Sequence, residues 1–324
     1  MSELPANGFS RRAVLVGGAL AGAALTIEGV PALAQAAAPE PERAPILKEI
    51  PSTGEKLPVI GVGTNNFGVS DPAEIAARRE VLAKLPELGG KVVDTAQSYG
   101  TSEAVIGEQV AGIGNRARLF LATKTAMRGD LSNPTAVIDQ SFAALRTDKI
   151  DLLQIHNLGG LDAFFPALLE YKKAGKIRYV GVSTSTDNQY PALVEALNKY
   201  PFDFVQVDYS IDNRGSEETI LPLAIAKKLA VLNNVPLGGR RGTNLIGQSA
   251  GKPLPPWAGE IGVTSWAQFF LKYNVSHPAI TAAIPGTTKA SHLEDNQKAG
   301  RGVLPDAAMR RRMEDYWKSV AAAA

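Results

Sequence analysis

Short apolar runs recur along the chain, and longer segments with helical spacing separate them. The eight runs, rich in Val, Ile and Leu, lie at 59–63, 91–94, 119–123, 151–155, 179–182, 203–207, 230–233 and 280–284. They are apolar without alternation, which is typical of strands buried on both faces in a parallel sheet. The pattern therefore predicts eight buried parallel strands.

The segments between the runs carry helix signals. Asp71 and Asn133 each precede a proline, which places a capping side chain before a residue suited to the first helical position. Ile138, Phe142 and Leu145 then recur at helical spacing, so one face of that helix is expected to be buried.

Strands that alternate with helices predict α/β architecture, here a (β/α)8 TIM barrel over residues 46–320. An N-terminal β-hairpin is expected at 46–57, turning at 52–54. An open, doubly wound sheet is the alternative. A glycine-rich nucleotide fingerprint would favour the open sheet, but Asn66 stands where that motif needs its third glycine after Gly61 and Gly63.

Composition excludes several classes of protein. The 324 residues are 45% hydrophobic and 20% charged, as in ordinary globular chains. With 34 basic and 32 acidic residues and no basic run, no nucleic-acid partner is expected. There is no cysteine, and only His156, His277 and His292 could supply imidazole, so no metal site is expected.

The N-terminal segment has the features of an export signal. Arg11 and Arg12 precede a short apolar stretch at 14–27, and an Ala-Leu-Ala sequence ends at Ala34. Paired arginines are typical of twin-arginine signals. The apolar stretch is shorter than the roughly 20 residues that span a membrane, so no stable membrane anchor is expected. We expect a signal peptide (1–34), a flexible tether (35–45) and export to the periplasm by the twin-arginine machinery.

Polar side chains close three consecutive apolar runs. Asp94 ends one run and Tyr99 follows it shortly, Lys124 follows the next run, and His156 follows the third. The carboxyl ends of barrel strands form the active face, so these four side chains are expected to converge. A tyrosine phenol ordinarily has a pKa near 10, and an adjacent ammonium favours its ionised form. Tyr99 is therefore the expected proton donor.

Lys124 would supply the positive charge, Asp94 would hold Lys124, and His156 would position a substrate oxygen. Such a set suits protonation of a carbonyl oxygen while hydride reaches the carbon. No side chain delivers hydride, so a nicotinamide is required.

At this point the sequence resembles the aldo-keto reductase superfamily from Ile46 to Trp317. The resemblance rests on GVGTNNFG, DTAQSYGTSEAVIGE, DLLQIHN, GKIRYVGVST, FDFVQVDYS and IPGTTKASHLEDNQKA. It implies reversible, NAD(P)H-dependent reduction of an aldehyde or ketone to an alcohol. The implied catalytic tetrad is Asp94, Tyr99, Lys124 and His156.

The resemblance also implies a set of cofactor-binding residues. Ser183 and Gln206 would bind the nicotinamide carboxamide. The pyrophosphate would lie near Pro236, Leu237 and Gly238. The adenosine end would be held by Gly286, Thr287, Thr288, Lys289, His292 and Asn296. Lys289 favours NADP(H) over NAD(H), although His292 stands where many relatives carry Arg, and Gly286 replaces a frequent Lys.

Two further expectations concern the pocket. Asn234 stands where many relatives stack an aromatic ring on the nicotinamide, so that stacking surface is expected to be lost. A substrate pocket could be lined by Asn65, Phe67, Met127 and Trp257. The alternative function is a nicotinamide-binding regulatory subunit with little turnover, which the intact tetrad disfavours.

Overall fold

The computed structural model describes residues 44–127, 132–239 and 244–322. The predicted signal peptide (1–34) lies outside the described residues, as does all but the end of the predicted tether (35–45). Residues Arg43–Ala324 form one compact unit. Among the described residues, none of the helices has the length and apolar character that crossing a membrane requires.

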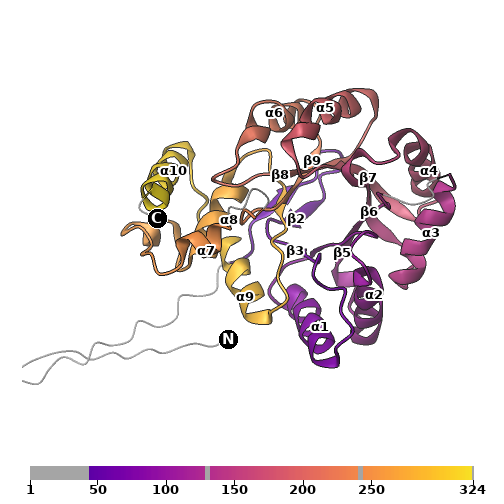
Figure 1. Ribbon diagram of the computed structural model, residues 1–324, viewed down its shortest axis with the longest axis horizontal. Helices are drawn as coiled ribbons and strands as arrows, with labels where there is room; N and C mark the ends of the chain where they lie inside the picture. Colours follow the sequence, from indigo (N-terminus) through magenta and orange to yellow (C-terminus); the bar gives the residue numbers. More distant parts are fainter. Residues whose placement is uncertain (1–43, 128–131, 240–243, 323–324) are drawn as a thin grey trace, which may run out of the picture. The chain divides into compact units, whose positions relative to one another are not determined.

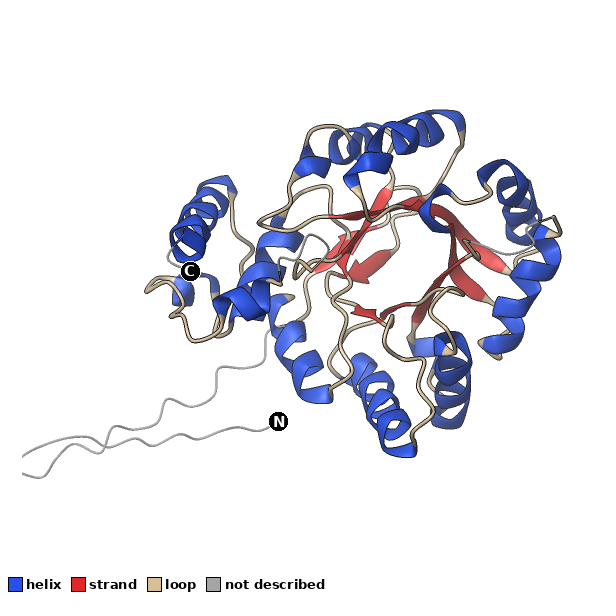
Figure 2. Cartoon of the chain, viewed as in Figure 1, coloured by secondary structure: helices blue, strands red, loops and turns tan. Residues whose placement is uncertain are grey.

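Eight parallel strands form the centre of this unit (Figure 2). They follow one another around the sheet in chain order, from β3 to β10. Their bounds are β3 (Val62–Gly63), β4 (Val92–Asp94), β5 (Phe120–Lys124), β6 (Ile150–Ile155), β7 (Ile177–Ser183), β8 (Phe204–Asp208), β9 (Ala230–Asn234) and β10 (Ala282–Ala283).

The sheet closes on itself through the segment around β3. Ile60 pairs in parallel with Ala283, and Gly63 pairs with Gly286. The Gly61 amide donates to the Ala283 carbonyl at 2.8 Å across this seam. The predicted (β/α)8 barrel is therefore confirmed, and the open sheet is wrong. The first and last strands are shorter than their apolar runs because the seam is made by isolated pairs.

Helices surround the strands on the outside (Figure 1). Their bounds are α1 (Pro72–Glu87), α2 (Ser102–Ile113), α3 (Pro134–Ala144), α4 (Leu161–Lys173), α5 (Tyr190–Lys199), α6 (Ile220–Ala226), α7 (Leu245–Ser249), α8 (Trp266–Ser276), α9 (Ala290–Ala299) and α10 (Ala307–Ala322). Helix α10 lies beyond the ring, beside α7 and α8 (Figure 1).

The predicted helix starts are confirmed. Asp71 Oδ1 accepts from the amides of Ala73 and Glu74, at 2.9 and 3.0 Å, before α1. Asn133 Oδ1 accepts from the Ala136 amide at 3.1 Å before α3. Each cap satisfies first-turn donors that have no partner within the helix.

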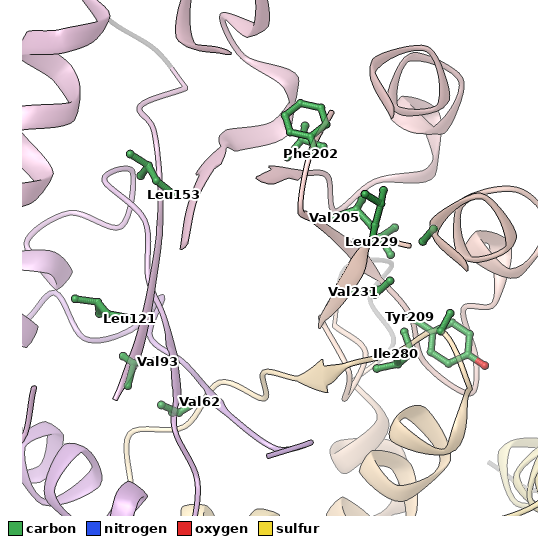
Figure 3. Packing of buried hydrophobic residues seen from close by; sticks show 14 of the residues in the cluster. Val62, Val93, Leu121, Leu153, Phe202, Val205, Tyr209, Leu229, Val231 and Ile280 are labelled. Atoms are coloured by element: carbon green, nitrogen blue, oxygen red, sulfur yellow. The ribbon is translucent and has the colours of Figure 1, made fainter. Parts of the chain in front are cut away.

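Alternate strand residues face two different apolar layers. Leu121 and Leu153 belong to the layer between strands and helices, and in Figure 3 both lie on the helix-facing side of their strands. Ala122 and Leu152 belong to a separate cluster inside the barrel. Successive residues of a strand point to opposite faces, so Lys124, two positions after Ala122, continues the interior row.

The predicted hairpin closes the amino end of the barrel. Strands β1 (Leu47–Glu49) and β2 (Lys56–Pro58) pair antiparallel. Ile50 and Leu57 join the interior cluster. Lys48 Nζ donates to the carbonyls of Val275 and Ile280, each at 2.7 Å, which ties the hairpin to the end of α8 and the approach to β10. The hairpin therefore covers the amino end of the barrel interior.

Candidate active site

A cleft of about 1120 Å³ opens at the carboxyl ends of the strands. The predicted site residues that line it are Asp94, Tyr99, Lys124, His156, Ser183, Gln206, Pro236, Leu237, Gly238, Gly286, Thr287, His292 and Asn296. Thr288 and Lys289 follow in the same loop and do not line it. The predicted tetrad thus converges at one end of one cleft.

The centre of the tetrad is an ion pair buried in the barrel. Lys124 Nζ donates to Asp94 Oδ2 at 2.7 Å and to the Thr95 carbonyl at 2.8 Å. Lys124 is 1% exposed and Asp94 is 2% exposed. The same ammonium donates to the Tyr99 hydroxyl at 3.5 Å. One fixed positive charge therefore touches both a carboxylate and a phenol.

The two buried charges act on one another. Burial raises the pKa of the Asp94 carboxyl, while the charge and hydrogen bond of Lys124 oppose that rise. Burial alone would lower the pKa of the Lys124 ammonium, but Asp94 and Tyr99 more than offset it, so that pKa is raised. Lys124 accordingly stays protonated across the neutral range.

Tyr99 and His156 face each other at the mouth of the interior. Their ring centroids are 5.9 Å apart with planes at 84°, an edge-to-face contact. Tyr99 comes from the loop between β4 and α2, and His156 directly follows β6. Both side chains line the cleft, so an oxygen bound between them could meet a hydroxyl and an imidazole.

Gln154 is a polar residue of the interior that the sequence reading did not single out. It lies on β6, is fully buried, and donates from Nε2 to Gln206 Oε1 at 2.7 Å. Gln206 Nε2 in turn donates to Asp94 Oδ2 at 3.5 Å. A row of side chains from three strands, β6, β8 and β4, therefore runs across the interior beneath the cleft.

Ser183 and Asn234 lie at the ends of β7 and β9, the strands on either side of β8. Ser183 Oγ accepts from the Asn157 amide at 3.2 Å. Asn234 Nδ2 donates to the Thr184 carbonyl at 2.9 Å, and Asn234 lines the cleft. This part of the wall is amide and hydroxyl, with no aromatic ring at residue 234.

The opposite arm of the cleft reaches the start of α9. That helix begins at Ala290 without a side-chain cap, which leaves first-turn amides free to donate to a bound group. Asn296 is 3% exposed on the same helix. Another loop that lines the cleft contains Pro236. The Pro236 carbonyl accepts from Asn274 Nδ2 at 2.8 Å, which fixes the position of this loop. Uncapped amides at a helix start suit a phosphate.

The residues predicted to form a substrate pocket separate into two groups. Asn65 lines the cleft. Phe67 is fully buried in the outer layer, and Trp257 packs against Phe269 with ring centroids 6.2 Å apart. Met127 Sδ lies 3.2 Å from Asn157 Nδ2 but does not line the cleft. Aromatic type alone could not separate packing from lining.

Further residues complete the walls of the cleft. They come from loops, from the start of α8 and from the middle of α9, and include Asn66, Asn157, Ser185, Lys252, Ser265, Trp266 and Asp295. None follows an apolar run directly, so strand-end position could not reveal them. Among the described residues, no group of three His, Cys, Asp or Glu side chains is placed to hold a metal ion.

Comparison with known proteins gives the same outline. A sequence profile described as "Aldo/keto reductase family" matches residues 59–314. Aldo-keto reductase YhdN of Bacillus subtilis is 29% identical over 203 residues, 56% of this chain and 59% of that protein. Methylglyoxal reductase DkgB of Salmonella typhimurium is 36% identical over 138 residues, 40% of this chain and 49% of that protein. The matched segments thus span under two thirds of these curated relatives.

Solved structures match over a larger share. An aldo/keto reductase from Klebsiella pneumoniae, in complex with NADP and acetate, is 25% identical with a TM-score of 0.66. The match covers 82% of this chain and 93% of that one. The thermostable aldo-keto reductase Tm1743, solved with the inhibitor epalrestat, is 27% identical with a TM-score of 0.68, covering 85% and 99%. By the extent of the profile match and the barrel it folds into, the chain belongs to the aldo/keto reductase family.

Proposed function

We propose that this protein is an NAD(P)H-dependent oxidoreductase that reduces an aldehyde or ketone to an alcohol, reversibly. The observation that carries the proposal is the contact of one buried ammonium, Lys124, with both Asp94 and the Tyr99 hydroxyl. The ammonium stabilises the phenolate that remains after Tyr99 gives up its proton.

Each member of the tetrad has one task in this proposal. Tyr99 donates its proton to the substrate oxygen. Lys124 holds the charge beside the phenol, and Asp94 fixes the ammonium at 2.7 Å. His156 hydrogen-bonds the same substrate oxygen and orients the carbonyl between its ring and that of Tyr99.

The residues present fit a nicotinamide dinucleotide. The cleft extends from the tetrad to the uncapped start of α9, which suits a pyrophosphate or ribose phosphate at that end. Ser183 and Gln206 would hold the nicotinamide carboxamide, Pro236 to Gly238 would approach the pyrophosphate, and Asn296 would hold the adenosine end. A bound reduced nicotinamide would supply the hydride that no side chain provides.

We propose NADP(H) as the preferred cofactor. Support comes from Lys289 at the start of α9 and from the solved Klebsiella pneumoniae relative, whose name mentions NADP. Titration of NADPH and NADH against the protein measures the preference. A dissociation constant for NADPH at least tenfold lower is expected, and equal values would remove the preference.

Replacement of Tyr99 by Phe tests the chemistry. The variant keeps the ring against His156 and loses the proton, so kcat with a panel of aldehydes should fall by about 10²-fold or more. The dissociation constant for NADPH should change less than threefold. A rate equal to that of the wild type would refute Tyr99 as the donor.

The same experiment separates the enzyme from a regulatory subunit that binds nicotinamide with little turnover. Wild-type protein that binds NADPH but turns over none of the carbonyl compounds would favour the regulatory role. Turnover that is lost in the Tyr99→Phe variant would favour the enzyme.

We further propose that the chain is exported to the periplasm by the twin-arginine machinery, with its nucleotide already bound. The support is the paired Arg11 and Arg12 before a short apolar stretch. Replacing both arginines by Lys should leave the protein in the cytoplasmic fraction. Periplasmic protein that never carries extractable nucleotide would contradict the second half of the proposal.

A further inference from the structure

Gln154 occupies a place where an apolar side chain would be expected. It continues the interior row of β6 after Leu152, and both residues are fully buried. Its Oε1 has no hydrogen-bond partner among the described residues. A buried amide with an unpartnered oxygen opposes folding, and a hydrocarbon of the same volume would not. Stability does not explain this residue.

The neighbouring strand leaves room for Gln154 to reach across it. On β7 the residue in register with Gln154 is Gly181. A Cβ atom at Gly181 would lie 2.9 Å from Gln154 Cγ, closer than side chains approach. The missing side chain on β7 thus lets the amide pass from β6 to Gln206 on β8.

The contact fixes which way the Gln206 amide points. Gln206 Oε1 accepts from Gln154 Nε2 at 2.7 Å, so the NH2 group of Gln206 faces the other way. That NH2 group lies 3.5 Å from Asp94 Oδ2, the oxygen that also accepts from Lys124. Gln154 and Asp94 favour the same orientation, because a flipped Gln206 would turn its oxygen toward the carboxylate and its NH2 group toward the Gln154 donor.

We propose that Gln154 is a positioning residue for the active site. By holding Gln206 with its NH2 group toward Asp94 and the cleft, it keeps a donor on the tetrad carboxylate and a donor for the nicotinamide carboxamide. The inference rests on the proposed function. Gln154 itself does not line the cleft and acts through Gln206, which does.

The pH dependence of kcat/KM at acid pH should depend on this arrangement. Burial raises the pKa of the Asp94 carboxyl, and hydrogen bonds from Lys124 and Gln206 oppose the rise. Loss of the Gln206 bond should raise that pKa further, so the carboxylate is protonated, and activity lost, at a higher pH. The other titratable groups near Asp94 are the tetrad members Tyr99, Lys124 and His156 and, on α2, Glu103, which accepts from Thr123 on β5.

The test is Gln154→Met, which keeps volume and removes the donor. The acid limb of kcat/KM should move up by about half to one pH unit, the shift that corresponds to one hydrogen bond. The dissociation constant for NADP⁺ should rise about five- to tenfold. The melting temperature should change little, because the variant removes the unpartnered Gln154 oxygen but also leaves the Gln206 oxygen without its donor.

Two more variants make the result specific. Leu152→Met places the same side chain one interior position earlier and should leave both the acid limb and NADP⁺ binding unchanged. Gly181→Ala crowds Gln154 without altering its chemistry and should reproduce the changes of Gln154→Met.

Outcomes against the inference are distinct from outcomes against the function. Wild-type protein that binds no NADP⁺ overturns the proposed function and this inference with it. If the wild type binds NADP⁺ and the Gln154→Met variant has the same acid limb and dissociation constant as the wild type, only the inference is overturned. A lower melting temperature with an unmoved acid limb would mark Gln154 as a packing residue and overturn it too.

Discussion

At the scale of single residues, the tetrad depends on a pair of buried charges, neither of which would be stable without the other. An isolated ammonium or carboxylate inside the barrel would be strongly disfavoured, but Lys124 and Asp94 each offset the burial of the other. The pair therefore keeps a positive charge next to Tyr99 at the bottom of a cleft.

Asp94→Asn should separate the two partners. The Lys124 ammonium would lose its counter-charge, burial would dominate, and its pKa would fall. Activity should then decline on the alkaline side about one pH unit or more below the wild-type limb, with kcat/KM reduced about 10²-fold at neutral pH. The free energy of unfolding should drop by about 3–5 kcal/mol, as for broken buried pairs.

The pH profile of kcat/KM and urea denaturation check this prediction. Asp315→Asn removes a carboxylate that is mostly exposed and should change neither measurement. An alkaline limb that stays in place in Asp94→Asn would show that Asp94 does not hold the charge on Lys124.

Sequence reasoning could bring the four predicted residues together because each lies at or shortly after the end of an apolar run, and strand ends meet at one face of a barrel. It could not find the Gln154–Gln206 contact, which depends on the direction of two side chains on strands separated by β7. It could not place Phe67 or Trp257 either, since an aromatic side chain suits a core and a cleft wall equally well.

At the scale of elements, close helix packing depends on a glycine. Gly107, inside α2, faces the end of α3, where an added Cβ would lie 2.3 Å from the Ala144 carbonyl oxygen. Backbone atoms cannot move aside as a flexible side chain can. The distance between α2 and α3 is therefore set by a residue without a side chain.

Gly107→Ala should lower the free energy of unfolding by about 1–3 kcal/mol through overpacking, despite the better helix propensity of Ala. Gly112→Ala, in the same helix, meets only Arg79 Nη1 at 3.1 Å. It should raise stability by up to about 1 kcal/mol. Denaturant unfolding of both variants measures these changes. Equal changes in the free energy of unfolding would mean that the α2–α3 contact is not tight.

The order of the elements could be predicted from the apolar runs, and the two proline-flanked caps confirm that local signals work where they are strong. Helix α10 has a weaker signal, because only Met313 and Trp317 are buried on it. Arg310 on this helix donates to the Tyr273 carbonyl at 2.5 Å and to the Tyr209 hydroxyl at 2.5 Å. These polar contacts to distant residues leave no periodic pattern.

At the scale of the whole molecule, residues far apart in the chain meet around His277, between α8 and β10. Its Nδ1 accepts from the Ala279 amide at 3.2 Å, and its carbonyl accepts from Lys48 Nζ at 2.8 Å. Burial, Arg310 and Lys48 lower the pKa of His277 to about 4. The imidazole is therefore neutral in the folded protein until the pH is quite acid.

This lowered pKa predicts acid sensitivity. The folded pKa lies below the ordinary value of 6.5, so the stabilisation is complete above that pH and is lost as the pH falls toward 4. Allowing for partial exposure, the loss should be about 1–2 kcal/mol. His277→Asn keeps an acceptor without titrating near neutrality. Parallel decline of both proteins between pH 7 and 4.5 would refute the assignment.

The barrel as a whole could be predicted, since eight buried runs alternating with helices have few other solutions. The seam between the first and last strands could not, because Gly63 and Gly286 pair at a distance that no local pattern encodes. The predicted signal peptide (1–34) stays a prediction.

The hairpin at the amino end of the barrel affects how molecules enter the interior. With Ile50 and Leu57 packed into the interior, the amino end of the barrel is covered, and the cleft opens at the carboxyl ends of the strands. If the proposed function holds, nucleotide and carbonyl compound enter through this same opening, and the molecule that binds next to Gln206 has to bind first. Steady-state kinetics should then be ordered. The nucleotide binds first and leaves last, and the carbonyl substrate binds and is released as product between these steps.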